Sequence, residues 1–258
     1  MNRCNPRQPT AFTMIELIVV IAIVLVLAGV AAPAVWGAYK SSSLAVSASN
    51  IRQLAAGGAA YLGDNNYRFW PYLVKTPAGD VYWFGLEAAE HRGKPEGERI
   101  VDMQAGPLGA YMPRSFRPDP SFAFTGKPFK PKYSFGYIGV GYNVHLAGET
   151  KSGKAIWLTR SDGPPPLRYW DLKNPAETVV FATSAQVYPF RKDAVIEEFY
   201  GIDEKEITVH FRHNNHAMVA FANGSAGFLP MDESTRDSKA PEANVGRFAP
   251  KGSKKYLR

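Results

Sequence analysis

The stretch AFTMIEL (residues 11–17) leads directly into the apolar run LIVVIAIVLVLAGVAAPAVW (residues 17–36). The run contains no charged residue, and its length is about that of an α-helix crossing ~30 Å of hydrocarbon at ~1.5 Å per residue. The sequence therefore predicts a membrane-spanning helix near the N-terminus. One carboxylate, Glu16, lies at the edge of the run, and an acid beside an otherwise apolar membrane helix indicates a functional site.

Two other classes of segment share some of these features. A secretory signal peptide has a basic start and an apolar region of only about 7–15 residues, followed by a small-residue cleavage site. Residues 17–36 form a longer run than that. A buried helix of a soluble protein rarely goes 20 positions without a polar side chain, so the spanning helix is the favoured interpretation.

The junction before the apolar run resembles the N-terminus shared by type IV prepilins and type II secretion pseudopilins. In that family a peptidase removes a short basic leader just before a Phe, the new N-terminus is methylated, and the fifth mature residue is Glu. A cut between Ala11 and Phe12 leaves Phe12 first and Glu16 fifth. Most family members have Gly before the cut, and this chain has Ala11 in its place.

The resemblance implies a structural subunit rather than an enzyme. Its expected partners are other pilin or pseudopilin subunits, prepilin peptidase, the inner-membrane assembly machinery and the lipid bilayer. It implies that Glu16 pairs with the methylated amine of Phe12 on a neighbouring subunit, because a buried charge needs an opposite one. Pro33 removes one backbone donor and is expected to kink or locally melt the helix, and pilins have a proline at the same distance from the mature start.

Charge is concentrated at the two ends of the chain. Arg3 and Arg7 lie in the leader, and the last residues, 246–258, contain five cations and no acid; together these account for the formal net charge of +7. The segment between them is neutral, which gives no indication of a nucleic-acid-binding domain. The basic leader predicts a cytoplasmic N-terminus, with the remainder on the periplasmic side of the inner membrane. The single Cys4 would leave with the leader.

The predicted fold class is α+β: a long N-terminal helix packed on a C-terminal antiparallel β-sheet with a long insertion loop. We expect a cleaved leader at 1–11, a membrane and filament-core helix at 12–36, its periplasmic half at 37–63, a β-rich domain at 64–230 and a basic, flexible tail at 231–258. Apolar residues between 39 and 62 recur at helical spacing, as in a helix that packs on a sheet. Residues 75–132 are rich in Pro, Gly and charge and indicate the variable loop region.

Several C-terminal segments indicate strands. Residues 178–182 follow an Asn-Pro turn and form an apolar run, and residues 218–222 precede Asn223-Gly224, the dipeptide favoured in two-residue hairpins with positive φ at both positions. Residues 133–146 are rich in aromatic residues and glycine and predict a further strand. These segments are similar to those of large pseudopilin-like proteins of planctomycete and verrucomicrobial type. Those proteins end with a His followed by Asp-Gly before the last strand, and here His213 and Asn223 take those positions.

Two further functions remain open. The loops at 75–132 would hold a carbohydrate or another ligand if the chain is a surface-binding module. A membrane-anchored zinc enzyme is the other alternative, because His210, His213 and His216 recur every third residue and a turn at residues 214–215 would bring the last two together. Glu87 and His91 would lie one turn apart on a helix as a second candidate metal pair. No nucleophile motif or phosphate loop accompanies them, so we expect no cofactor, with calcium or zinc as the possible ions.

Overall fold

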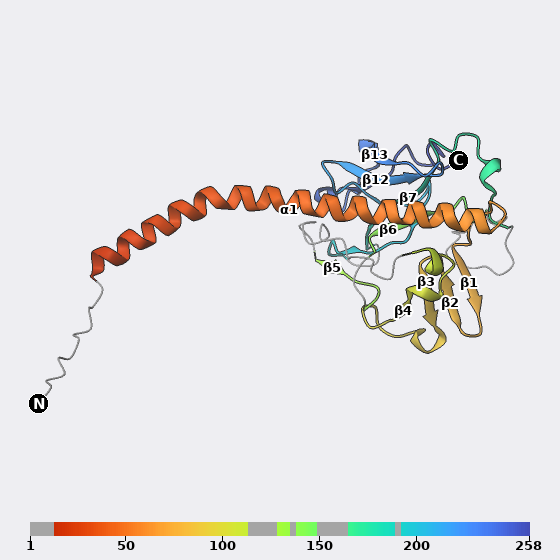
Figure 1. Ribbon diagram of the computed structural model, residues 1–258, viewed down its shortest axis with the longest axis horizontal. Helices are drawn as coiled ribbons and strands as arrows, with labels where there is room; N and C mark the ends of the chain where they lie inside the picture. Colours follow the sequence, from red (N-terminus) through yellow and green to blue (C-terminus); the bar gives the residue numbers. More distant parts are fainter. Residues whose placement is uncertain (1–12, 113–127, 135–137, 149–164, 189–191) are drawn as a thin grey trace, which may run out of the picture. The chain divides into compact units, whose positions relative to one another are not determined.

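The computed structural model describes residues 13–112, 128–134, 138–148, 165–188 and 192–258. The chain divides into two compact units, Met1–Ser42 and Ser43–Arg258. One helix, α1 (Met14–Asp64, 51 residues), contributes residues to both (Figure 1). Its end at Asp64 agrees with the helix expected to run to residue 63. The two units are described separately below.

The first unit contains the apolar part of α1. Every described side chain from residue 13 to residue 35 is exposed. Among the described residues, α1 is the one helix long and apolar enough to cross a membrane, with a mean hydropathy of 3.0 in its most apolar window. Residues on both sides of Pro33 are helical, so the helix is not melted there. The kink expected at this proline stays a prediction.

The second unit is organised around a five-stranded sheet. The sheet has the order β10-β6-β7-β12-β13, and the parallel pair β10–β6 is followed by antiparallel neighbours. Its strands are β6 (Val140–Asn143), β7 (Val179–Thr183), β10 (Gly201–Ile202), β12 (His216–Phe221) and β13 (Ala226–Pro230). The strands predicted at 178–182 and 218–222 correspond to β7 and β12. The α+β fold class is therefore confirmed.

A second, four-stranded antiparallel sheet lies in the region expected to be an insertion loop. It has the order β1-β2-β3-β4. Its strands are β1 (Leu73–Thr76), β2 (Gly79–Tyr82), β3 (Gly85–Ala88) and β4 (Val101–Asp102). Residues 75–132 were expected to form a variable loop region with one or two short helices or strands, and this was wrong for residues 75–102, which contain more regular structure. Strands of two to four residues joined by tight turns leave no long apolar alternation in the sequence.

Short elements complete the second unit. Two small sheets are formed by β11 (Val209–His210) with β14 (Val245–Gly246), and by β5 (Phe129–Lys130), β9 (Ile196–Glu197) and β8 (Gln186–Val187). The 3₁₀ helices are η1 (Ala89–His91), η2 (Met103–Ala105), η3 (Gly109–Tyr111), η6 (Tyr169–Asp171), η7 (Glu233–Thr235) and η8 (Pro241–Ala243).

The C-terminal part of α1 packs into the largest core of the second unit (Figure 1). Ile51 and Leu54 are fully buried in the same cluster as Trp70, Tyr142 and Phe181. The ring of Trp70 stacks on Tyr142 with centroids 5.0 Å apart and on Phe181 with centroids 5.5 Å apart. The expected amphipathic half of the helix is thus confirmed, with the sheet supplying the aromatic surface that it covers.

The C-terminal segment is folded, and the expectation of a flexible tail at 231–258 was wrong. Met231, Val245 and Leu257 are buried. The amide of Val179 at the start of β7 donates to the carbonyl of Tyr256 at 2.8 Å. The segment forms η7, η8 and β14. Its apolar residues are few and scattered and form no periodic pattern in the sequence. The contacts that bury them come from distant strands.

Candidate processing and assembly site

The described chain begins with a capping box at the N-terminus of α1. Thr13 is the residue before the helix, and its amide and hydroxyl both donate to Oε2 of Glu16, each at 2.9 Å. The amide of Glu16 donates in return to the Thr13 hydroxyl at 3.3 Å. A Thr-x-x-Glu pair satisfies two backbone donors that would otherwise lack partners at a helix start. The Glu16 carboxylate therefore has a local structural role in the uncut chain.

This geometry leaves room for a second role. Both hydrogen bonds to Glu16 end on the same oxygen, Oε2, so the cap uses one of the two carboxylate oxygens. A carboxylate in the first helical turn is also favoured by the helix dipole. The capping-box pattern T-x-x-E is visible in the sequence as Thr13-Met14-Ile15-Glu16. The sequence-based interpretation assigned Glu16 to assembly alone and did not consider this cap.

Ala11 and Phe12, the two residues of the predicted cleavage and methylation site, lie outside the described residues. The structure describes the chain from Thr13 onward. What it adds is the segment immediately after the predicted cut, where a helix of 51 residues starts two positions beyond Phe12.

Comparison with protein families matches one part of the chain. The model of the prokaryotic N-terminal methylation motif matches residues 7–32. These residues contain the predicted cut, Glu16 and most of the exposed apolar helix. The chain carries a type IV prepilin-like N-terminus. No curated protein and no solved structure gives a significant match.

The prepilin-like N-terminus gives a coarse functional assignment. A methylation motif of this kind marks a substrate of prepilin peptidase, and the apolar helix behind it fits anchoring in a membrane. It indicates a structural, pilin-type protein with other pilin subunits as partners, in general terms. The matched residues end at 32, so the fold and contacts of the second unit must be read from its own residues.

In this prepilin-like chain, Asn223 and Gly224 lie in a hairpin turn between β12 and β13, but the expected two-residue turn was wrong. The Phe221 amide donates to the Ser225 carbonyl at 2.8 Å, and the Gly224 amide donates to the Phe221 carbonyl at 3.0 Å. The loop therefore has three residues, and of the two predicted turn positions only Gly224 has a positive φ, 86°. Such loops end in a left-handed glycine.

The side chain of Asn223 has a local structural role in this turn. Its Oδ1 accepts hydrogen bonds from the amide and the hydroxyl of Ser225 at 3.0 and 2.7 Å. An Asp carboxylate would accept the same bonds, since both residues offer an oxygen at that position. The motif at this turn is thus satisfied by local structure, and nothing in it requires a ligand.

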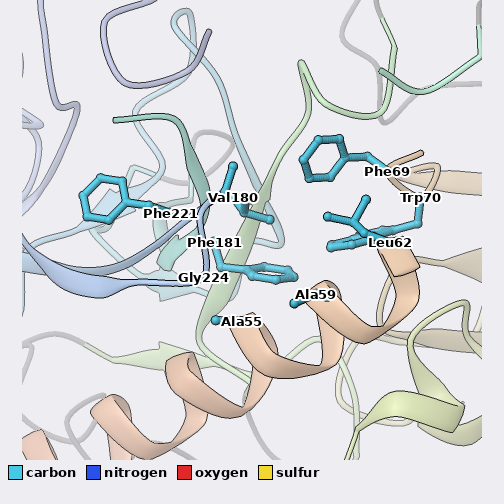
Figure 2. Close-up of a pocket in the computed structure, with 11 residues that line it drawn as sticks. Ala55, Ala59, Leu62, Phe69, Trp70, Val180, Phe181, Phe221 and Gly224 are labelled. Carbon is cyan, nitrogen blue, oxygen red and sulfur yellow. The ribbon is translucent and has the colours of Figure 1, made fainter. Parts of the chain in front are cut away.

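A small, mostly apolar pocket lies beside this turn (Figure 2). Its lining comes from α1, from the segment around Trp70, from strands β7 and β12 and from the turn that follows β12: Ala55, Gly58, Ala59, Leu62, Phe69, Trp70, Val180, Phe181, Phe221, Ala222 and Gly224. Figure 2 shows the ring of Phe181 directed toward Ala55 and Ala59 of the helix. Gly224 therefore lies where the hairpin meets the packed helix.

The three C-terminal histidines are placed differently from one another. Asn214 and Asn215 have φ of 51° and 59° and form a tight turn, and His213 and His216 exchange two backbone hydrogen bonds across it, at 3.1 and 2.9 Å. The predicted turn that brings these residues together is present. His210 is buried on β11. No group of three or more metal-ligating side chains occurs among the residues that the structure describes.

The geometry predicted for the second candidate metal pair, Glu87 and His91, was wrong. Glu87 is on strand β3 and His91 on η1, so the two are not one helical turn apart. Glu87 is buried, accepts a hydrogen bond from the Tyr133 hydroxyl at 3.1 Å and forms an ion pair with Arg99 at 3.5 Å. Its carboxylate is therefore part of a buried polar network that joins β3 to the segment around Tyr133.

Sequence reasoning overlooked the buried amide of Asn143. Its Nδ2 donates to the carbonyls of Val179 and Leu257 at 2.8 and 3.0 Å, and its Oδ1 accepts from the amide of His145 at 3.1 Å. It closes the Gly-Tyr-Asn element that resembles a family motif. The structure gives this element a structural role, because Asn143 joins β6 to the start of β7 and to the C-terminal segment.

Proposed function

We propose that the chain is cut between Ala11 and Phe12, methylated at Phe12 and assembled through its N-terminal helix into a type II secretion pseudopilus or type IV pilus-like filament. Two observations on the same segment support this proposal. The methylation motif matches residues 7–32, and the continuous helix that follows the predicted cut has every described side chain exposed from residue 13 to residue 35.

The exposed apolar surface supports two successive environments for this segment. A soluble protein rarely leaves so large an apolar surface uncovered. Lipid covers it in the membrane, where the backbone of a helix satisfies its own hydrogen bonds. In a filament, side chains of neighbouring helices replace the lipid contacts. The basic leader, with Arg3 and Arg7, supports an orientation with the N-terminus in the cytoplasm and the second unit in the periplasm.

Glu16 is the residue that we expect to distinguish the two environments. In the filament its carboxylate would pair with the methylated amine of Phe12 on a neighbouring subunit. The capping box offers a competing explanation for the same side chain, because Thr13 and Glu16 already bind each other. The two roles differ in what they need: the cap requires a hydrogen-bond acceptor, whereas the filament contact requires a negative charge.

Two substitutions separate these roles. Glu16→Gln keeps an acceptor at the third helical position, where Gln also forms a capping box, but removes the charge. Thr13→Ala removes the cap and keeps the charge. We expect Glu16→Gln to insert in the membrane at wild-type levels but to enter filaments at about a tenth of the wild-type level or less, since a tenfold loss corresponds to only about 1.4 kcal/mol. Thr13→Ala is expected to assemble nearly as well as the wild type.

The measurement is the amount of each variant in sheared filaments relative to its amount in the membrane fraction, by immunoblot. Normal assembly of Glu16→Gln would show that the charge is not needed. If Thr13→Ala fails to assemble while Glu16→Gln succeeds, the role of Glu16 is the helix cap, and the proposed contact with Phe12 is wrong.

A further inference from the structure

Two aromatic side chains of the second unit are exposed side by side. Tyr67 is 50% exposed and Trp170 is 57% exposed. Their ring centroids lie 5.4 Å apart with an interplanar angle of 47°. Burying a large aromatic side chain contributes much to stability, so two such side chains that are exposed next to each other call for a functional explanation.

The backbone holds this pair in place although its members are far apart in the sequence. The Phe69 amide donates to the Leu167 carbonyl at 2.9 Å, and the Tyr169 amide donates to the Tyr67 carbonyl at 2.8 Å. These bonds join the segment after α1 to the start of η6. The two rings are therefore presented by a fixed backbone.

The conformation of Tyr67 is unusual for its residue type. Its φ is 54°, in the left-handed region, which a bulky non-glycine residue seldom occupies. Asn66 before it has a φ of 52°, and the Tyr67 amide donates to the Leu62 carbonyl at 2.8 Å as α1 ends. Glycine is the residue that fits such a helix end. Strained backbone of this kind is concentrated at functional positions.

Trp170 is likewise exposed, although residues close to it in the sequence pack into the core. On either side of it, Tyr169 packs against the main core and Leu172 is buried. A polar residue at position 170 would leave those core contacts unchanged. The core does not explain a tryptophan there.

Polar and charged groups surround the two rings. The guanidinium of Arg168 lies over the Trp170 ring, 5.6 Å from its centroid, which is a cation–π contact. The Arg168 amide donates to the Asp171 carboxylate at 2.8 Å. Arg168, Asp171 and Asn66 are exposed. The rings thus form a small apolar island whose rim consists of hydrogen-bonding side chains.

The size of this island favours a small flat ligand over a protein partner. Two half-exposed rings offer together roughly 200 Å² of apolar surface, whereas a stable protein interface buries about 800 Å² on each side. The other exposed large hydrophobic side chains that the structure describes in this unit are Ile100 and Phe228, and neither is among the aromatic contacts of the pair. A pyranose ring fits the island, since its C–H face covers an aromatic ring while its equatorial hydroxyls reach the rim.

We propose that Tyr67, Trp170 and Arg168 form a binding site for a β-linked polysaccharide of glucose or N-acetylglucosamine. In these sugars the ring substituents are equatorial, so both faces of the ring present C–H groups and stack on an aromatic side chain. Arg168 and Asp171 supply a donor and an acceptor for the hydroxyls. The site lies outside the loops at 75–132 in which a carbohydrate was expected from the sequence, and it does not depend on filament assembly.

The test is co-sedimentation of the full chain with insoluble cellulose, chitin and purified peptidoglycan. The protein is kept in an amine-oxide detergent, because a detergent with a sugar headgroup would compete for the site. We expect the wild type to bind at least one of the three polymers. Trp170→Ala is expected to raise its Kd about tenfold or more, which corresponds to the loss of a stacking contact.

Two controls separate binding from folding. Phe228→Ala removes another half-exposed aromatic ring, with 46% of the residue exposed, and its Kd should stay within about twofold of the wild type. Tyr67→Gly removes one ring of the pair but suits the left-handed backbone, so it should weaken binding without lowering the melting temperature.

Two outcomes would overturn the proposal. One is a wild-type chain that sediments with none of the three polymers, and the other is Trp170→Ala binding as tightly as the wild type. If no polymer binds and analytical ultracentrifugation in the same detergent shows oligomers that Trp170→Ala abolishes, the aromatic pair is a contact between copies of the chain and the glycan proposal is wrong.

Discussion

Glu198 is a fully buried carboxyl that accepts hydrogen bonds from two backbone amides. Its two oxygens accept from the amides of Lys132 and Ile138 at 3.3 and 3.0 Å. Burial raises its pKa to about 7, against the opposing effects of the Tyr200 hydroxyl, these two amides and the Lys132 side chain. The residue therefore changes protonation near neutral pH inside the folded domain, where most carboxylates are already ionised.

The sign of its effect on stability follows from this direction. The folded-state pKa lies above the unfolded value of 4.5, so the folded state binds the proton more tightly. Its contribution to stability is complete below pH 4.5 and is lost as the pH rises to about 7. A shift of this size corresponds to about 3 kcal/mol at most.

We predict that Glu198→Gln flattens the pH dependence of unfolding. The free energy of unfolding of the wild type relative to the variant should fall by about 1–3 kcal/mol between pH 5 and pH 8. The amide of Gln places a donor against one of the two backbone amides, but that cost does not depend on pH. Urea unfolding of both proteins across this range measures the slope, and parallel profiles would show that Glu198 does not titrate there. Burial also lowers the pKa of the His145 imidazole, and the comparison with the variant removes any contribution that both proteins share.

At the scale of elements, α1 depends on two glycines where it enters the core of the second unit. A Cβ at Gly57 would lie 2.8 Å from the backbone carbonyl oxygen of Tyr111, and one at Gly58 would lie 2.9 Å from the Trp70 ring. Glycine normally weakens a helix, so these two glycines alone would weaken the last turns of α1. In the structure, the missing side chains at these two positions allow the segments around Tyr111 and Trp70 to approach α1 closely.

We predict that Gly57→Ala destabilises the second unit by about 1–3 kcal/mol. The new methyl group meets a backbone atom that moves only with its whole segment, and this outweighs the gain of up to about 1 kcal/mol in helix propensity. Gly63→Ala is the matched control, because nothing lies within 4 Å of its Cβ position, and it should stabilise slightly. Thermal unfolding of the two variants gives the comparison, and equal melting temperatures would contradict the close packing of Tyr111 on α1.

The elements that the sequence predicted share one property: their pattern is local. The apolar run of α1, the strand β7 and the strand β12 each show their periodicity or their turn residues within a few positions. The missed elements lack such patterns. Strands β1–β4 are too short for alternation, and the C-terminal segment is ordered by bonds such as that from the Val179 amide to the Tyr256 carbonyl.

The candidate sites follow the same division. The junction around Phe12 and Glu16 was predictable because its spacing is contiguous in the sequence. The Tyr67–Trp170 pair was not, because two residues separated by about a hundred positions become neighbours only through the fold. The other aromatic residues close to Tyr67 in the sequence have a different environment, since Phe69, Trp70 and Tyr72 are buried in the core.

At the scale of the whole molecule, charge and hydrophobicity are divided along the chain. The first unit carries an uncovered apolar helix, and the second unit has its own buried cores. The first therefore needs a membrane or a filament to cover it, whereas the second has what a folded domain needs. This division fits the proposed assembly, in which the anchor passes from lipid to a filament while the folded domain keeps its structure.

Mass spectrometry of the mature N-terminus shows whether the chain is processed as a prepilin. The protein is expressed with a prepilin peptidase and extracted from membranes. The account predicts a chain that begins at Phe12 and carries one methyl group on its amine. A chain that retains Met1, or one cut after Ala32, would contradict it and leave a plain membrane anchor or a signal sequence instead.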